Sequence, residues 1–153
     1  MAKNNSLYRK KAETHLVESI KVKQLTLEKC MNSILAAAQL IVNTFLSGGK
    51  VLLCGNGGSA ADCQHMATEL VNTLDKNFIR PSLPAFALTT DTSVITSFSN
   101  DFGFDGVFER QIQGLGKSND LLIGISTSGN SKNIIRAMIA ANTIKMHTLA
   151  LTG

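Results

Sequence analysis

The stretch VLLCGNGGSAADCQHMATELV, from Val51 to Val71, carries the pattern that decides the fold. Its first four residues are apolar and form a run of the length of a strand that is covered on both faces. A Gly-Asn-Gly-Gly-Ser loop follows, and from Ser59 the apolar residues recur three or four positions apart, as in a helix. A strand, a glycine-rich loop and a helix in this order predict one unit of an α/β fold.

The same order of elements repeats along the rest of the chain. Apolar runs of strand length occupy residues 50–54, 84–89, 120–126 and 147–153, and helical patterns occupy residues 59–74, 92–99, 105–115 and 131–142. Strands that alternate with helices predict a central parallel sheet flanked by helices, which is a three-layer α/β fold. The last run ends at Gly153, so we expect a partner subunit, or a further part of a longer protein, to cover the sheet there.

The N-terminal part of the sequence predicts helices. From about Leu27 to Phe45 the apolar residues follow a strong helical period, which Gly48 and Gly49 should end. Residues 7–23 are more weakly amphipathic and predict a separate or kinked helix. We therefore expect an N-terminal helix over 1–26 and a single α/β domain over 27–153.

Composition and charge exclude several classes of protein. The apolar and charged fractions are those of a soluble globular chain, no run approaches the roughly 18 apolar residues of a membrane span, and no secretion signal is evident. The net charge of +4 arises within residues 1–29, without the interleaved aromatic residues of a nucleic-acid site. Three cysteines without Cys-x-x-Cys spacing predict reduced, mostly buried thiols. We expect a cytoplasmic protein that binds neither nucleic acid nor membranes.

Two strand-to-helix loops have the composition of anion-binding sites. CGNGGSAAD follows the first predicted strand, and GISTSGNSKN overlaps the end of the third. Small residues let a ligand approach the backbone, the first-turn amides of the next helix face it, and hydroxyls such as that of Ser59 add donors. The same residues are also ordinary turn and cap formers, but two such loops at the carboxyl ends of parallel strands favour a phosphate site. Ser126, Thr127, Ser128 and Ser131 are the candidate donors in the second loop.

His65 and Glu69 lie four residues apart on the helix that follows the first loop. The expected buried stripe of that helix contains Ala60, Cys63, Ala67, Leu70 and Leu74, and His65 and Glu69 lie on the opposite side. Their side chains should therefore stack one turn apart, where they can share a divalent metal, with Zn²⁺ favoured by the imidazole. A solvated outer helix face is the alternative explanation. The neighbouring phosphate loop favours a site the length of a sugar phosphate.

These residues resemble the sugar isomerase (SIS) domain and, within it, the phosphoheptose isomerases. The resemblance runs from about Leu27 to Gly153 and rests on three blocks: GGKVLLCGNGGSAADCQHMATEL, LTTDTSVITSFSNDFGFDGVFERQ and DLLIGISTSGNSKNII. It implies substrate contacts at Asn56, Gly57, Gly58, Ser59, Glu69, Asn100, Asp101, Ser126, Thr127, Ser128 and Ser131. It also implies that His65 and Glu69 bind one Zn²⁺ and that Glu69 is the catalytic residue.

The resemblance implies a reaction as well. Phosphoheptose isomerases convert sedoheptulose 7-phosphate to D-glycero-D-manno-heptose 7-phosphate, an aldose–ketose isomerisation in which a base moves a proton between C1 and C2. This step opens the synthesis of the ADP-heptose precursor of lipopolysaccharide core or capsule. The family resemblance further implies a homotetramer in which a neighbouring subunit helps to enclose the site.

The sequence departs from the family pattern in two places. The family usually carries a Thr/Ser-Gly-Arg element where this chain has Val71, Asn72 and Thr73, so Arg80 is the alternative basic contact. The family also ends with a helix bearing Gln and His, from which the remaining two zinc ligands and a second acid/base group are expected beyond Gly153. We therefore expect this chain to lack the C-terminal part of the family fold.

Two other functions compete with catalysis. One is a non-catalytic SIS-domain protein that binds the bacterial replication initiator, a group that shares the RPSLPAFAL type of segment. The other is a regulatory domain that senses phosphosugars. The presence of Glu69 favours the isomerase, because the initiator-binding group is expected to lack this carboxylate.

Overall fold

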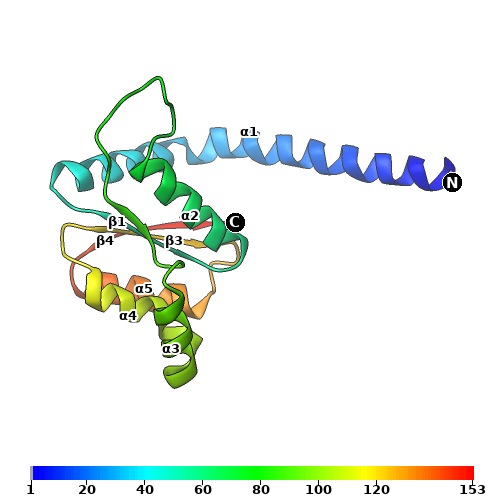
Figure 1. Ribbon diagram of the computed structural model, residues 1–153. Helices are drawn as coiled ribbons and strands as arrows, with labels where there is room; N and C mark the ends of the chain where they lie inside the picture. The colour runs from blue at the N-terminus through cyan, green and yellow to red at the C-terminus, as the bar shows by residue number, and fades with distance from the viewer. Residues whose placement is uncertain (1) are drawn as a thin grey trace. The chain divides into compact units, whose positions relative to one another are not determined.

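The computed structural model describes residues 2–153, with side chains from residue 5 onward. Contacts between residues divide the chain into two compact units, residues 1–39 and 40–153. The first unit is part of a single long helix, α1, which spans Ala2–Leu46 and also supplies the first residues of the second unit. The second unit is an α/β domain with a parallel sheet (Figure 1).

Helix α1 corrects one expectation. A separate or kinked helix was expected over residues 7–23, yet α1 is continuous through this region and through the expected boundary at residues 26 and 27. The physical reason is that α1 contains neither glycine nor proline, so nothing interrupts its backbone hydrogen bonds. The helix ends as expected, with Gly48 in the left-handed region at a φ of 74° and the Gly49 amide donating to the Thr44 carbonyl.

The described part of α1 is long and, over part of its length, apolar. From Asn5 to Leu46 it is long enough and, in one window, apolar enough to cross a membrane. Core helices of soluble proteins meet the same criterion of length and composition. This helix is therefore weak evidence for a membrane segment.

The four expected strands form one parallel sheet. They are β1 (Val51–Gly55), β2 (Ala85–Ala87), β3 (Leu121–Ser126) and β4 (His147–Thr152), in the order β2-β1-β3-β4. Each pair of neighbours is parallel, so the carboxyl ends of all four strands lie at one edge of the sheet. The sheet confirms the predicted fold class.

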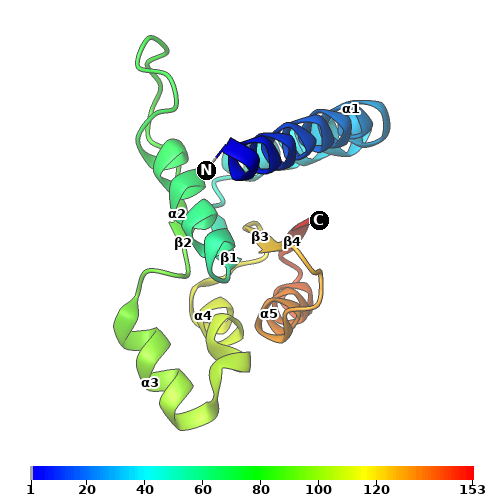
Figure 2. The same cartoon turned by 90° about the vertical axis from the view of Figure 1, so that its right-hand side faces the viewer.

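Helices connect the strands and cover both faces of the sheet (Figure 2). They are α2 (Gly58–Val71), α3 (Thr92–Phe102), α4 (Val107–Leu115) and α5 (Lys132–Thr143), with a 3₁₀ turn at Phe104–Gly106 before α4. Helix α2 is shorter than expected, so Leu74 lies outside it and is 79% exposed rather than part of the buried stripe.

Two apolar clusters confirm the three layers. Alternate residues of β1 and β3 face α4 and α5, in a cluster that includes Leu52, Cys54, Leu122, Phe108, Ile112 and Ala137. The intervening residues face α2 and the end of α1, in a cluster that includes Val51, Leu53, Ile123, Cys63, Ala67 and Phe45. Both central strands are therefore buried on both faces, whereas the edge strand β4 is mostly exposed.

Candidate active site

The two glycine- and serine-rich loops lie side by side at the carboxyl edge of the sheet. β1 and β3 are direct neighbours, and Gly55 at the end of β1 pairs with Ile125 near the end of β3. The loops that lead into α2 and α5 therefore start next to each other. In an open α/β sheet this is where a ligand is expected.

Glycines shape the first loop so that the start of α2 is open. A Cβ atom at Gly55 would lie 2.6 Å from the carbonyl oxygen of Ser59, so only glycine fits at the end of β1. Gly57 has a φ of 55°, which side chains rarely allow. No side chain caps the first turn of α2, and Gly57 and Gly58 are exposed. The Ala60 and Ala61 amides already donate to carbonyl oxygens of the loop, so the amides of Gly58 and Ser59 are the ones open to an anion.

The second loop presents hydroxyl groups at the start of α5. The Ser126 hydroxyl is mostly buried and lies 3.2 Å from that of Ser131, and the Ser131 side chain makes no capping bond to α5. Thr127 and Ser128 are exposed, and the Ser128 hydroxyl accepts a hydrogen bond from the Asn130 amide at 3.2 Å. The four predicted donors thus lie between the last residue of β3 and the start of α5.

A pair of asparagines joins the two loops. Asn56 of the first loop and Asn133 of α5 exchange two side-chain hydrogen bonds, of 3.0 and 2.9 Å. Asn133 was not among the predicted site residues. The sequence carried a signal, because Asn133, Ala137 and Ala141 are spaced four residues apart and so share one face of a helix. The structure shows that all three are buried. A buried amide needs hydrogen-bonding partners.

His65 and Glu69 stack on the exposed side of α2, as predicted. His65 Nε2 lies 3.5 Å from Glu69 Oε1, and the two side chains are 74% and 28% exposed. Two ligands on one tetrahedral Zn²⁺ at about 2.0–2.1 Å lie about 3.4 Å apart, so the pair fits two positions of such a site. Among the described residues, no group of three His, Cys, Asp or Glu side chains gathers at one place.

Arg80, the alternative basic contact, is used inside the fold. Its Nη2 atom donates to the carbonyl oxygen of Glu69 at 2.6 Å, and its Nη1 atom donates to that of Leu70 at 2.9 Å. These carbonyls belong to the last turn of α2, where they have no helical partner. Arg80 therefore holds the C-terminal end of the helix that carries Glu69.

Asn100 and Asp101 lie in the last turn of α3, where both are exposed and hydrogen-bonded to each other at 2.9 Å. Helix α3 packs with α4 and α5, on the opposite side of the sheet from α2 (Figures 1 and 2). No contact described within this chain joins these two residues to His65 or Glu69.

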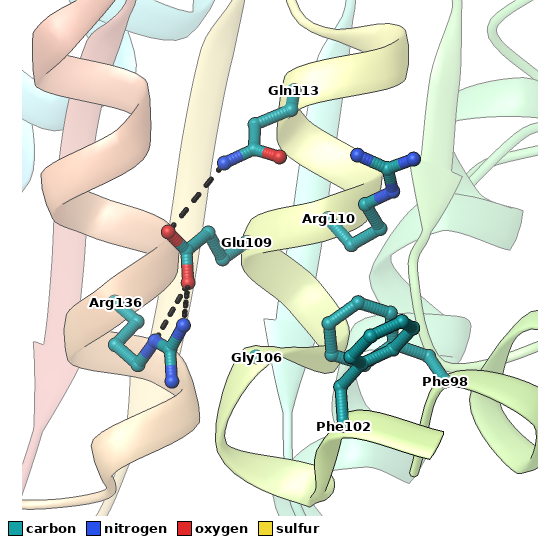
Figure 3. Close-up of a pocket in the computed structure, with 7 residues that line it drawn as sticks. All are labelled: Phe98, Phe102, Gly106, Glu109, Arg110, Gln113 and Arg136. Atoms are coloured by element: carbon teal, nitrogen blue, oxygen red, sulfur yellow. Dashed lines mark hydrogen bonds and ion pairs between the residues drawn. The ribbon is translucent and has the colours of Figure 1, made fainter. Parts of the chain in front are cut away.

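A separate hollow of about 380 Å³ lies on the α3, α4 and α5 side (Figure 3). Its lining consists of Phe98, Phe102, Gly106, Glu109, Arg110, Gln113 and Arg136. The Glu109 carboxylate accepts hydrogen bonds from Arg136, at 2.6 Å, and from Gln113, at 3.5 Å. None of the predicted site residues lines this hollow, and its carboxylate is already bound, so it does not replace the loop site.

Comparison with known proteins identifies the family of the chain. The model of the SIS domain family matches residues 15–153. The chain is therefore a SIS-domain protein, the class of protein that its fold and its two loops define.

The relatives make the assignment more specific. The phosphoheptose isomerase of Neisseria gonorrhoeae strain NCCP11945 is 49% identical over 139 residues, which are 91% of this chain and 70% of that protein. The phosphoheptose isomerase of Roseiflexus sp. is 53% identical over 135 residues, or 88% of this chain and 68% of that protein. The chain belongs to the phosphoheptose isomerase family.

Solved structures lead to the same family. A phosphoheptose isomerase from Neisseria gonorrhoeae superimposes with a TM-score of 0.88 at 46% identity, covering 95% of this chain and 74% of that one. One from Francisella tularensis gives a TM-score of 0.89 at 40% identity, covering 94% and 74%.

Proposed function

We propose that this chain catalyses the conversion of sedoheptulose 7-phosphate to D-glycero-D-manno-heptose 7-phosphate. One observation carries the proposal: in a chain of the phosphoheptose isomerase family, the stacked pair His65 and Glu69 directly follows an open, glycine-lined loop. As part of this proposal, the reaction is the first step toward the ADP-heptose precursor of lipopolysaccharide core or capsule and takes place in the cytoplasm.

The two loops bind the substrate phosphate. The exposed amides at Gly57 and Gly58 and the hydroxyls of Ser59, Ser126, Thr127, Ser128 and Ser131 supply donors for an anion. Asn56 contributes its side-chain amide. The phosphate fixes the end of the substrate that does not react, which leaves C1 and C2 to reach the exposed side of α2.

Glu69 moves the proton. Its carboxylate takes a proton from C1 of the ketose, and the electrons of that C–H bond form the C1=C2 double bond of an enediol as the carbonyl oxygen on C2 gains a proton. Glu69 then returns its proton to C2. The C1 hydroxyl loses its proton, and C1 becomes the aldehyde carbon. Atoms and charge balance, and no redox partner is needed.

The cofactor of the proposal is Zn²⁺, held by His65 Nε2 and Glu69 Oε1 as two of its ligands. When bound, the metal would stabilise negative charge on substrate oxygens. The 3.5 Å spacing of the two side chains supports this role. Removal of metal by a chelator should therefore lower turnover, and added Zn²⁺ should restore it.

The proposed active form is a homotetramer. His65 is 74% exposed in this chain, and Asn100 and Asp101 lie on the other side of the sheet from α2. A neighbouring copy that presents the end of α3 would bring these residues to a site that one copy leaves open.

The substitution Glu69→Gln tests the function. It removes the base but keeps the shape of the side chain, so turnover of sedoheptulose 7-phosphate should fall by about 10²–10⁴-fold. Glu13→Gln, which changes an exposed carboxylate of α1, serves as the control and should retain activity.

Other results would redirect the assignment. Unchanged turnover in Glu69→Gln would show that another group is the base. Capture of the replication initiator by a chain that does not turn over phosphosugars would favour the interaction protein instead. Tight phosphosugar binding without turnover would favour the regulatory domain.

A further inference from the structure

Asn133 makes more hydrogen bonds than its place in a helix requires. It is the second residue of α5 and only 3% of its surface is exposed. Its Oδ1 atom accepts a hydrogen bond from the Ile134 amide at 3.0 Å and another from Asn56 Nδ2 at 3.0 Å. Its Nδ2 atom donates to Asn56 Oδ1 at 2.9 Å.

The bond from the Ile134 amide determines which way both asparagines point. A backbone N–H only donates, so the Asn133 atom that faces it must be the oxygen. The other end of the Asn133 amide is then the NH₂ group, which donates to Asn56. This donation in turn requires that the Asn56 atom facing it is Oδ1, so the orientation of Asn56 follows from the backbone of α5 through one buried side chain.

The same pair fixes the distance between the two phosphate-binding loops. Asn56 follows β1, whereas Asn133 lies two residues beyond Ser131 in the loop after β3. The two mutual bonds use one hydrogen of Asn56 Nδ2 and one lone pair of its Oδ1. Asn56 therefore keeps one N–H for a ligand, in a direction that Asn133 sets.

We propose that Asn133 is a positioning residue for the isomerase reaction. It is buried and acts through Asn56, which it holds in one orientation with the first loop at a set distance from the second. This proposal rests on the proposed function, because Asn56 is taken as a substrate contact. The benefit is preorganisation, since a donor that is already aimed needs no reordering when the substrate binds.

A double-mutant cycle separates positioning from general stabilisation. Asn133→Ala should lower kcat/KM for sedoheptulose 7-phosphate by about 10–100-fold, measured well below its own unfolding temperature. Asn56→Ala should cause a similar loss. If Asn133 acts through Asn56, the double variant should be no worse than Asn56→Ala alone, whereas independent roles would make the two losses multiply.

Two further variants keep the test decisive. Asn133→Ser retains an oxygen for the Ile134 amide but is too short to reach Asn56, so it should fold and still lose activity. Asn119→Ala is the control, because it removes an asparagine side chain that donates through Nδ2 to a single partner, the Ser47 carbonyl, at an exposed position before β3. This control should keep its kcat/KM.

The possible outcomes distinguish this inference from the proposed function. If the wild-type chain turns over substrate and Asn133→Ser keeps full kcat/KM, or if the two losses multiply, the positioning role is wrong and the isomerase assignment stands. If the wild-type chain binds sedoheptulose 7-phosphate without turnover, the isomerase assignment fails and the same cycle is measured as dissociation constants. If it neither binds nor turns over the substrate, both proposals are wrong.

Discussion

At the scale of single residues, the loop that starts the candidate site depends on the absence of one side chain. Gly55 closes β1 against the first turn of α2, and a Cβ atom there would lie 2.6 Å from the Ser59 carbonyl oxygen. That oxygen belongs to the backbone, so it cannot rotate away as the end of a side chain could. The close approach of strand and helix is what presents the loop amides at the sheet edge.

Gly55→Ala should therefore destabilise the fold by about 1–3 kcal/mol, the usual cost of overpacking. Gly114→Ala is the control, because a Cβ atom at Gly114 in α4 meets nothing within 4 Å. That substitution should stabilise the helix by up to about 1 kcal/mol. Chemical denaturation of the two variants measures both effects, and equal stability of the two would contradict the close approach.

The buried thiols also lead to a prediction at this scale. Burial raises the pKa of Cys54 to about 12 and that of Cys63 to about 11, from the ordinary value of 9.0. In Cys30→Ser, which removes the exposed cysteine, both remaining thiols should react with a thiol reagent at pH 8 at least about a hundredfold more slowly than in the denatured chain. Rapid reaction of the native variant would argue against their burial.

The same thiols make stability depend on pH. Since their pKa values are higher in the folded chain, their contribution is complete below pH 9 and is lost as pH rises from about 9 toward 12. Replacing both by Ala in the Cys30→Ser background should make the unfolding free energy fall less steeply across this range. Denaturation measured at pH 8, 9 and 10 gives the slopes, and parallel slopes would rule out the thiols as the cause.

At the scale of elements, a buried ion pair joins the amino ends of the two central strands. Asp120 precedes β3 and is 2% exposed, and its carboxylate accepts from the Lys50 amide at 2.9 Å, the Lys50 ammonium at 2.5 Å and the Lys117 amide at 2.8 Å. These bonds hold the starts of β1 and β3 in register. The register in turn determines where the two loops begin at the other edge of the sheet.

Asp120→Ala should destabilise the domain by about 3–5 kcal/mol, because it leaves the Lys50 ammonium partly buried and unpaired. Lys132→Gln, which breaks an exposed pair with Asp105 of 3.9 Å, should change stability by no more than about 1 kcal/mol. Thermal unfolding of both variants provides the comparison. A small effect at Asp120 would mean that water solvates the pair more than its burial indicates.

At the scale of the whole molecule, the chain exposes apolar surface that a partner copy could cover. In the first unit, the exposed apolar side chains of α1 include Leu16, Val17, Ile20, Leu27 and Leu35. The α/β unit in turn leaves His65 exposed, and α3, which carries Asn100 and Asp101, lies on the other side of the sheet from α2 (Figure 2). Light scattering at micromolar concentration should therefore give a mass several times that of one chain, and a monomer would contradict an assembled site.

Complementation tests whether the site is shared. Glu69→Gln and Asp101→Asn should each inactivate a homo-oligomer. If the two residues come from different copies, co-expression of the variants should restore activity to about a quarter of wild type before the oligomers are sorted, because each site needs an intact Glu69 from one copy and an intact Asp101 from another. Purification through two different tags isolates the mixed oligomers. Recovery of no activity in them would place both residues in the site of one copy.

The elements of the α/β domain were predictable because each depends on local patterns of apolar residues and on glycine. The four strands, the end of α1 at Gly48 and the stacking of His65 with Glu69 follow from spacing along the chain. The continuity of α1 was misjudged, because its weak amphipathic period was taken as a break although no glycine or proline interrupts it. Leu74 was assigned to a helix that ends at Val71.

The sequence by itself therefore determined the fold class, the two loops and the pairing of His65 with Glu69, since all of these depend on residues close together in the chain. Only the tertiary structure decided which distant residues meet. Asn56 and Asn133 are 77 positions apart, and Arg80 reaches back to the end of α2. Such contacts depend on the order of strands in the sheet and on the need of each buried polar group for a partner, which no local pattern of residues records.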